Sequence, residues 1–174
     1  MIRVVLSVAL LLAGCKRMET PTGGDFKDVT ASMVMTGMTQ YMTTEGLRRA
    51  RLQGDTAYVY DDSGKVVVKG VNLDIFNETG AETAKLTSKT GDFNTSTQAM
   101  IARGTVVLVT ADKRRIETEE LFYDPQTHRL WSNVQTVMIE NGQRASGDGF
   151  TSDDKFQNLQ VKNLRGKAPV KIQF

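Results

Sequence analysis

Few side chains in this sequence have the type and spacing needed for catalysis or metal binding. The 174 residues include one histidine, His128, and one cysteine, Cys15, which leaves almost nothing for a metal cluster or a nucleophilic triad. The acidic pairs at residues 61–62 and 153–154 lie in turn-like stretches, and a calcium site would need more oxygen ligands at ordered spacing. We therefore expect no metal, no cofactor, no catalytic residues and a binding or scaffold protein instead of an enzyme.

Phosphate chemistry is also disfavoured. Gly64-Lys65 does not form a phosphate-binding loop, because Val59 stands where the upstream glycine is required and Val66 replaces the serine or threonine. The chain has no visible means of hydrolysing ATP, so energy for any transport must come from a partner. The short basic run at residues 113–115 could contact phosphate groups, or it could form a solvated turn.

Composition indicates one globular domain. The chain has 22 Lys and Arg against 20 Asp and Glu, with 40% hydrophobic and 24% charged residues. This near balance excludes an electrostatic nucleic-acid binder and makes wholesale disorder improbable. The composition therefore predicts a chain that folds around a hydrophobic core.

The N-terminus is typical of an exported protein. Arg3 precedes an apolar run over residues 4–12, and small residues follow at 13 and 14. The run has nine residues, whereas a helix that spans a bilayer needs about 20. We expect residues 1–14 to be a cleaved signal peptide.

Leu12-Ala13-Gly14-Cys15 resembles the lipobox of bacterial lipoproteins. The resemblance implies cleavage before Cys15 and attachment of lipid to it; the alternative is a plain secretory signal with an incidental cysteine. Because Cys15 is the only cysteine, no intrachain disulfide can form. Residues 15–32, which contain Pro21, Gly23 and Gly24, are expected to be a flexible tether, and residues 33–174 the folded domain.

Strand and turn patterns dominate from residue 33 onward. Strand-like segments occur at residues 66–68, 105–109 and 134–139, and turn-forming residues lie at 61–64, 77–80, 124–125 and 141–142. Asn141-Gly142 is a strong two-residue hairpin pattern. No convincing helical period of apolar residues is present, so the sequence predicts an all-β domain.

The chain is also internally repetitive. Units that start at Leu52, Leu86, Ile116 and Ala145 align without gaps, and each has strand, polar turn and strand at matching offsets. Shared apolar positions lie two residues apart, so they fall on one face of a strand. We expect stacked β units that form a repetitive antiparallel sheet folded over on itself, apolar inside and polar outside.

The repeated β units, the short N-terminal anchor and the segments Leu121-Phe122-Tyr123-Asp124 and Gly147-Asp148-Gly149-Phe150 resemble the LptC family of lipopolysaccharide export, to which the LptA bridge protein is related. The resemblance covers residues 33–166. It implies a V-shaped β-jellyroll with an open groove for acyl chains. It also implies partners: lipopolysaccharide, the membrane subunits of an ABC transporter and an LptA-like bridge protein.

Alternation along the strands then defines the candidate lining of such a groove, although core packing is the alternative for each side chain. The candidates are Leu52, Val59, Val66, Val68, Leu73, Ile75, Leu86, Phe93, Met100, Val107, Val109, Ile116, Leu121, Tyr123, Leu130, Val137, Ile139, Phe150 and Leu159. Small residues at 57, 91, 102 and 132 would leave room inside. Thr136 is expected on the polar face, and Trp131 outside.

The two ends of the domain are candidate edge strands, because an edge offers unpaired N–H and C=O groups to another sheet. The resemblance implies that the N-terminal edge, with Met35, Met38 and Tyr41, faces the transporter. It implies that the C-terminal edge, with Val170, Ile172 and Phe174, faces the bridge protein. Alternatively, residues 170–174 simply close the domain.

One departure from the family concerns the anchor. Many LptC proteins carry a transmembrane helix, whereas this sequence offers a lipidated Cys15 followed by Lys16. The family role implies the periplasm and the inner membrane, whereas Lys16 in place of Asp would favour the outer membrane. Both membranes therefore remain alternatives for the anchor. The number of lipids, the headgroup contacts and an LptC-like or LptA-like role stay open too. A lipidated scaffold that binds only proteins is the competing hypothesis.

Overall fold

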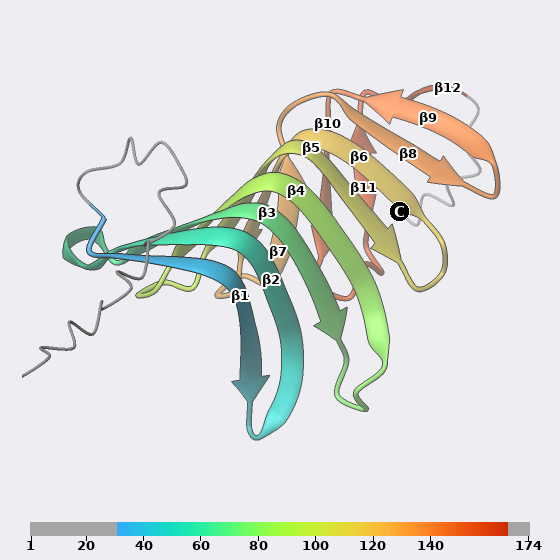
Figure 1. Ribbon diagram of the computed structural model, residues 1–174. Helices are drawn as coiled ribbons and strands as arrows, with labels where there is room; N and C mark the ends of the chain where they lie inside the picture. Colours follow the sequence, from blue (N-terminus) through green and yellow to red (C-terminus); the bar gives the residue numbers. More distant parts are fainter. Residues whose placement is uncertain (1–30, 167–174) are drawn as a thin grey trace, which may run out of the picture.

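The computed structural model describes residues 31–166, and this part of the chain is almost entirely antiparallel β structure (Figure 1). One 3-10 turn, η1 (Asp61–Ser63), is present among the described residues, and none of their helices is long and apolar enough to cross a membrane. The strands are β1 (Met33–Thr44), β2 (Leu47–Tyr60), β3 (Lys65–Phe76), β4 (Glu82–Asn94), β5 (Met100–Thr110), β6 (Arg115–Asp124), β7 (Arg129–Ser132), β8 (Thr136–Glu140), β9 (Gln143–Gly147), β10 (Gly149–Asp153), β11 (Gln160–Lys162) and β12 (Arg165–Gly166).

The strands form a meander that divides at β6. Strands β1 to β6 pair in sequence order, each antiparallel to the next. The last part of β6, at residues 122–124, pairs with β7, whereas its first part, at residues 115–118, pairs with β8. Strands β10 and β11 extend the sheet beyond β7, and β9 and β12 extend it beyond β8. The prediction of an all-β, repetitive antiparallel fold is confirmed.

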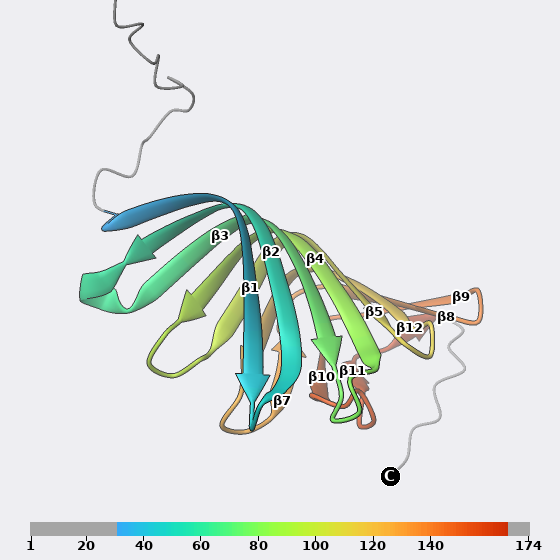
Figure 2. The same ribbon diagram turned by 60° about the horizontal axis from the view of Figure 1, so that its bottom comes forward.

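A line of bends crosses the sheet and separates it into two half-sheets. The regular register is interrupted between Gln53 and Thr56 in β2, between Thr87 and Thr90 in β4, and between Arg103 and Val106 in β5. The first half-sheet contains residues 33–36, 56–60, 65–69, 90–94, 100–103 and 120–124 with β7, β10 and β11. The second contains residues 38–44, 47–53, 71–76, 82–87, 106–110 and 115–118 with β8, β9 and β12. Figure 2 shows the strands arching over this line.

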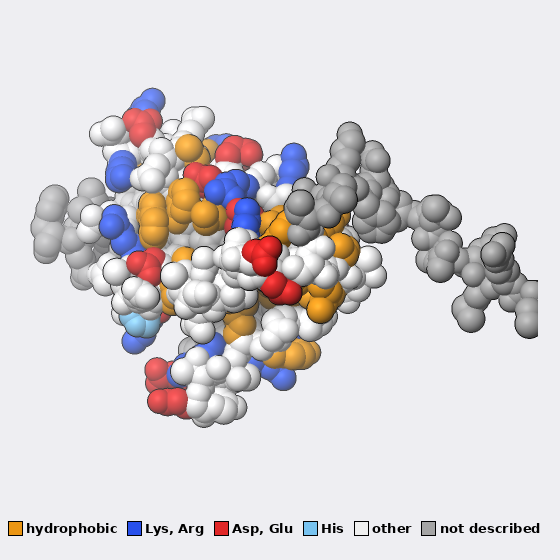
Figure 3. Space-filling model, turned by 90° about the vertical axis from the view of Figure 1, so that its left-hand side faces the viewer, with side chains coloured by type: hydrophobic (Ala, Val, Ile, Leu, Met, Phe, Trp, Pro, Cys, Tyr) orange, Lys and Arg blue, Asp and Glu red, His pale blue; other side chains and the backbone are white. Residues whose placement is uncertain are grey.

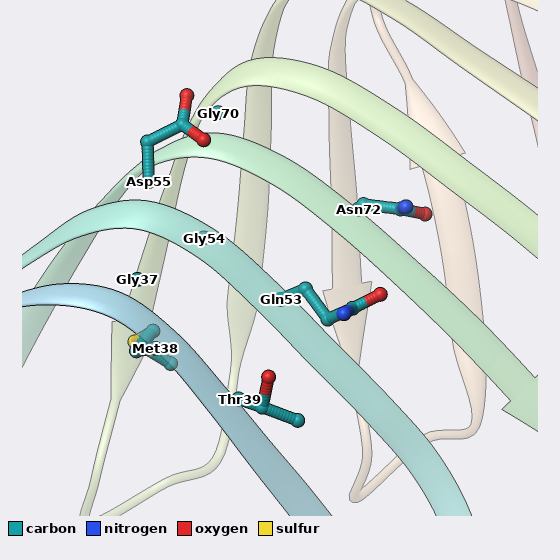
Figure 4. A pocket seen from close by; sticks show the side chains of 8 residues that line it. All are labelled: Gly37, Met38, Thr39, Gln53, Gly54, Asp55, Gly70 and Asn72. Atoms are coloured by element: carbon teal, nitrogen blue, oxygen red, sulfur yellow. The ribbon is translucent and has the colours of Figure 1, made fainter.

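Gly70 shows why the bend needs particular residues. Its φ of +67° is a left-handed conformation that favours glycine. A Cβ at this position would also collide with the carboxylate of Asp55, which projects over Gly70 (Figure 4). Gly37 and Gly54 lie beside it in β1 and β2, and the bend there encloses a shallow, polar hollow of about 290 Å³. Gly70 therefore helps to determine where β3 turns from one half-sheet into the other.

The turns fall on two opposite rims, as the repeat predicts. Polar turns at residues 61–64, 95–98, 125–128 and 154–157 line the rim of the first half-sheet. They lie at the same offset within each of the four units, so the repeat is confirmed. Asn94 illustrates their chemistry: its Oδ1 accepts hydrogen bonds from the backbone N–H groups of Ser96 and Thr97, at 2.9 and 2.8 Å.

The outer face of the sheet carries ladders of opposite charge. Asp74 in β3 is fully buried between two cations: Arg51 Nε donates to its Oδ2 at 2.7 Å, and Lys85 Nζ lies 3.1 Å from its Oδ1. Burial acts to raise the pKa of Asp74, but the hydrogen bonds and charges of Arg51 and Lys85 outweigh it and hold that pKa below its usual value. The ladder ties β2, β3 and β4 together on the side away from the core.

Candidate functional site

The two half-sheets turn apolar rows toward a common interior. Strand register places one row across the first half-sheet, from Val59 through Val66, Phe93, Met100 and Tyr123 to Leu130. A second row crosses the other half-sheet, from Leu52 through Leu73, Leu86, Leu108 and Ile116 to Met138. Members of both rows belong to one hydrophobic cluster. We call the space between these rows the trough.

The trough changes character along its length. At β1 to β4, the lining residues Leu52, Val59, Val66, Leu73 and Phe93 are only partly buried. In β5 and β6, Leu108 is 0% and Ile116 1% exposed. The interior is therefore accessible at the N-terminal end of the sheet, which we call the open end. The opposite end, lined by β5 to β11, is more tightly packed, although Met100, Tyr123 and Leu159 remain partly exposed, and we call it the closed end.

Two phenylalanines contribute to the closed end. Phe150 in β10 lies opposite Ser132 and Val161 and is 1% exposed. Phe156 comes from the loop between β10 and β11 and is 2% exposed within the same cluster. Phe150 was among the predicted lining residues. Phe156 was missed, because it lies in a turn position where the other repeats have polar residues.

Most predicted lining residues lie on the inner face. The register and the common cluster place Leu52, Val59, Val66, Val68, Leu73, Ile75, Leu86, Phe93, Met100, Ile116, Leu121, Tyr123, Leu130, Phe150 and Leu159 on this side. Trp131, as expected, lies on the opposite face from Leu130, where its ring stacks on Phe122 with centroids 5.3 Å apart. The sequence thus predicted most of the inward-facing set.

Four predicted lining residues lie on the wrong face. Val107 and Val109 pair with charged or polar outer residues such as Glu117 and Arg115, and Val137 and Ile139 pair with these same two residues from β8. The inward positions are instead those of Val106, Leu108, Thr136 and Met138, all buried. Thr136, expected on the polar face, is 1% exposed and points inward.

The bend explains the error at Val107 and Val109. In β3 the bend has one left-handed residue, Gly70, so the inward positions shift from Val68 to Val71 and the alternation changes parity. In β5 two left-handed residues, Gly104 and Thr105 with φ of +76° and +48°, occur together, so parity is kept. A gap-free alignment of the repeats cannot represent this difference.

Small residues lie inside the sheet along the bend, and they do not leave the free space for a ligand that the sequence predicted. Ala57 pairs with Val68, which pairs with Gly91, and Gly91 pairs with Ala102. All but Gly91 are classed as buried, and a Cβ on Gly91 would come within 3.0 Å of Val71 Cγ2. The small side chains therefore allow close approach at the bend, and the accessible part of the interior lies nearer the rims.

Buried hydroxyl groups interrupt the apolar lining where β6 separates from β7 and β8. Thr118 Oγ1 lies 2.9 Å from Ser132 Oγ, and Thr136 Oγ1 donates to the carbonyl of Val134 at 3.1 Å. These hydroxyls bond to one another and to backbone carbonyls, which satisfies them at the branch of the sheet. Their partners provide no general base, so the group stabilises the fold and has no features of a catalytic site.

Tyr123 is the titratable side chain in the two apolar rows, and it does not bring a charge into the trough. Burial raises the pKa of Tyr123, and the negative charges of Asp154 and Asp124 raise it further. The Tyr123 phenol therefore remains neutral at physiological pH. His128 lies at the rim, exposed, with its Nδ1 2.7 Å from Asp154 Oδ2. Within residues 31–166, no group of three His, Cys, Asp or Glu side chains is arranged to hold a metal ion.

The basic run at residues 113–115 does not form one patch. Lys113 is exposed, Arg114 donates from Nη2 to the carbonyl of Phe156 at 2.6 Å, and Arg115 donates from Nε to Glu117 at 2.8 Å. The three side chains therefore have separate environments, and two of them already have partners within the domain.

Strand β1 is a long free edge. It stands at the end of the strand order and has no partner on its outer side within the described part of the chain. Met33 is 55% and Tyr41 47% exposed, and Figure 3 shows hydrophobic side chains at the surface of the molecule. Met35 and Met38 lie on the same strand. Cys15, Val170, Ile172 and Phe174 lie outside the described residues.

The fold is of the LptA class of β-jellyrolls. A similar solved structure is that of LptH from Pseudomonas aeruginosa, described as the LptA-homologous periplasmic component of the conserved lipopolysaccharide transport device; the match has a TM-score of 0.52 and 16% identity, and covers 70% of this chain and 89% of that one. No curated protein matches the sequence.

The sequence assigns the family within this class. Residues 4–167 match the family described as "Lipopolysaccharide-assembly, LptC-related", and the chain belongs to this family. Its members are transport proteins and not enzymes. The chain is therefore a periplasmic component of lipopolysaccharide transport.

Proposed function

We propose that this protein accepts lipopolysaccharide from an inner-membrane ABC transporter, holds its acyl chains in the trough and passes them to an LptA-like bridge protein. The observation that carries the proposal is the pair of facing apolar rows, which are partly exposed at the open end although members of both rows belong to the core cluster. Exposed apolar surface of this kind is stabilised when it is covered by a hydrocarbon ligand.

The energetics suit a protein that both takes up and releases lipid. Each methylene buried against the rows contributes about 0.8 kcal/mol, so a chain of about 14 carbons gains on the order of 10 kcal/mol before the costs of binding. The membrane offers a similar gain per methylene. Transfer between membrane and trough is then nearly balanced, and its direction is set by the ATPase of the transporter.

Two further features support a position between membrane and partners. Cys15, if lipidated, would anchor the chain to a membrane in the periplasm, and residues 16–31 would connect it to β1. The free edge of β1, with exposed Met33 and Tyr41, suits pairing with a strand of the transporter's periplasmic domains. We assign the C-terminal edge, with Val170, Ile172 and Phe174, to the bridge protein.

A second candidate function is a lipidated scaffold that binds partner proteins through its edges and carries no lipid. The closed end favours it, because Leu108 and Phe150 are 0% and 1% exposed there and offer no apolar surface to a lipid. In this case the partly exposed residues at the open end would be covered by protein.

Adjacent valines in β3 distinguish these two functions. Val66 lines the trough and Val67 points to the outer face, and both are partly buried. A photo-reactive amino acid at position 66 should crosslink to lipopolysaccharide in cells, whereas the same group at position 67 should not. Equal labelling at both positions, or labelling of protein alone at position 66, would rule out the trough as the lipid site.

Lipidation is tested separately. Cys15→Ser should abolish incorporation of a labelled fatty acid and release the protein from membranes, while its domain remains folded. Incorporation that persists in Cys15→Ser would overturn the proposed anchor without affecting the trough.

A further inference from the structure

Phe156 departs from the pattern of the other turns on the same rim. Three of the four turns carry a left-handed residue twelve positions after the start of their unit: Gly64, Gln98 and His128. None of these is buried. In the fourth turn the left-handed residue lies one position earlier in the unit: it is Phe156, with φ of +57°, and its side chain is 2% exposed. Left-handed backbone is uncommon for an aromatic residue, so the surrounding structure must hold it.

The loop is held by side chains that fix its shape. Asp153 accepts hydrogen bonds from the backbone N–H of Gln157 at 2.8 Å and from the Asn158 amide at 2.7 Å. The backbone N–H of Phe156 donates to the carbonyl of Asp153 at 3.1 Å. These bonds direct the aromatic ring inward, where it joins the cluster that contains Leu108 and Met138.

Arg114 joins this loop to the opposite rim. It lies in the turn between β5 and β6, on the rim of the second half-sheet, and its Nη2 donates to the carbonyl of Phe156 at 2.6 Å. Its Nε donates to Asp112 Oδ2 at 2.7 Å, and its side chain is only 18% exposed. The contact therefore bridges the two rims and holds the mouth of the trough shut at this point.

From this geometry we infer that Phe156 ends the trough and limits how long an acyl chain it can hold, with Arg114 as the positioning residue that keeps Phe156 in place. The inference rests on the proposed function, since it concerns the depth of the same trough. A chain that enters at the open end runs along the two apolar rows until it meets the aromatic ring. A smaller side chain at position 156 would extend the path, and a larger one would shorten it.

The test measures how affinity depends on chain length. Saturated fatty acids of increasing length are titrated into the full-length protein by displacement of a fluorescent fatty acid. Each further methylene that enters the trough raises affinity roughly fourfold, and methylenes that remain outside raise it little. We expect the chain length at which affinity stops rising to be greater in Phe156→Ala than in the unaltered protein, and smaller in Phe156→Trp.

Controls separate a specific effect from loss of folding. Phe122→Ala removes the same side chain from the outer face, where Phe122 stacks on Trp131, and should leave the length limit unchanged. Phe156→Leu is the substitute if Phe156→Ala does not fold, and it should move the limit in the same direction by less. An identical limit in all variants would overturn the inference while leaving the trough intact as a lipid site; no binding of any fatty acid to any variant would overturn the proposed function as well.

Arg114 is tested through its dependence on Phe156. Arg114→Gln should extend the length limit in a protein with Phe156, whereas it should add nothing in the Phe156→Ala background, and Arg114→Lys should restore part of the original limit. A change of thermal stability alone, with the limit unmoved by Arg114→Gln, would show that Arg114 only stabilises the fold.

Discussion

The open and closed ends of the trough are built from the same repeat but are stabilised differently. At the open end, Leu73 and Phe93 are partly exposed, and the outer face holds the strands together through buried Asp74 and its two cations. At the closed end, Leu108 and Phe150 are almost completely buried. The difference indicates that the second part of the repeat provides the stability of the fold, which leaves the first part free to expose apolar surface.

The largest effect should come from a phenylalanine at the closed end. Phe150→Ala removes a ring that is 1% exposed and should lower the free energy of unfolding by about 3–5 kcal/mol. Phe93→Ala, at the open end, removes a partly exposed ring and should cost only about 1–1.5 kcal/mol. Denaturant titrations of both variants measure these losses, and equal losses would refute the contrast between the two ends.

Alanine substitutions of two glycines on the bend should also differ in how much they destabilise the closed and the open end. Gly149 has φ of +151°, and a Cβ there would collide with the backbone carbonyl of Ser132, so Gly149→Ala should cost roughly 3 kcal/mol because strands must move. At Gly70 the obstacle is the mobile end of the exposed Asp55 side chain. Gly70→Ala should therefore cost only about 1–2 kcal/mol, from its left-handed backbone. Thermal unfolding that ranks Gly70→Ala as the more damaging change would contradict this assignment.

Asp74 should make the open end sensitive to acid. Its pKa is lower in the folded protein than in the unfolded chain, so its contribution is complete above the usual carboxylate range and is lost as pH falls through the folded-state pKa. Asp74→Asn should cost roughly 2 kcal/mol at neutral pH, and less as the pH is lowered toward about pH 3 and below. Denaturation midpoints at several pH values test this, with exposed Asp62→Asn as the control; a loss that is independent of pH would argue against the ion pairs.

The smallest effect on stability is expected at the free edge. Met35 is 37% exposed on β1, so Met35→Lys should change the free energy of unfolding by no more than about 0.5 kcal/mol. The same change should weaken crosslinking of β1 to the transporter's periplasmic domains, because edge pairing is opposed by a lysine. Undiminished crosslinking in this variant would count against β1 as the docking edge.

Much of the fold was predictable from the sequence because turn residues and alternation are local properties. The turns at Asp61 and Asp124 and the inward row from Val66 to Leu130 follow from composition and period alone. The bend was not predictable, because one left-handed residue in β3 and two in β5 determine parity through backbone geometry. For the same reason Val107 and Val109 were placed on the wrong face; Val137 and Ile139 follow the break between β7 and β8, which a gap-free repeat does not contain.

Phe156 could not be found by the same rules. It occupies a turn, where the period of the strands does not apply, and only its burial in the folded domain and the contact from Arg114 across 42 residues show that it belongs to the interior. An aromatic residue in a repeat position that otherwise holds Ser63, Thr97 or Thr127 was the one available indication in the sequence.

The central claim is that the open end of the trough holds the acyl chains of lipopolysaccharide. Native mass spectrometry of the protein extracted from its own membranes tests it most directly, with Leu73→Asp on the inner face compared with Asn72→Asp on the outer face. We predict that lipopolysaccharide stays bound to the unaltered protein and to Asn72→Asp but is lost from a folded Leu73→Asp. Equal retention of lipid by both variants, or its absence from the unaltered protein, would contradict the account.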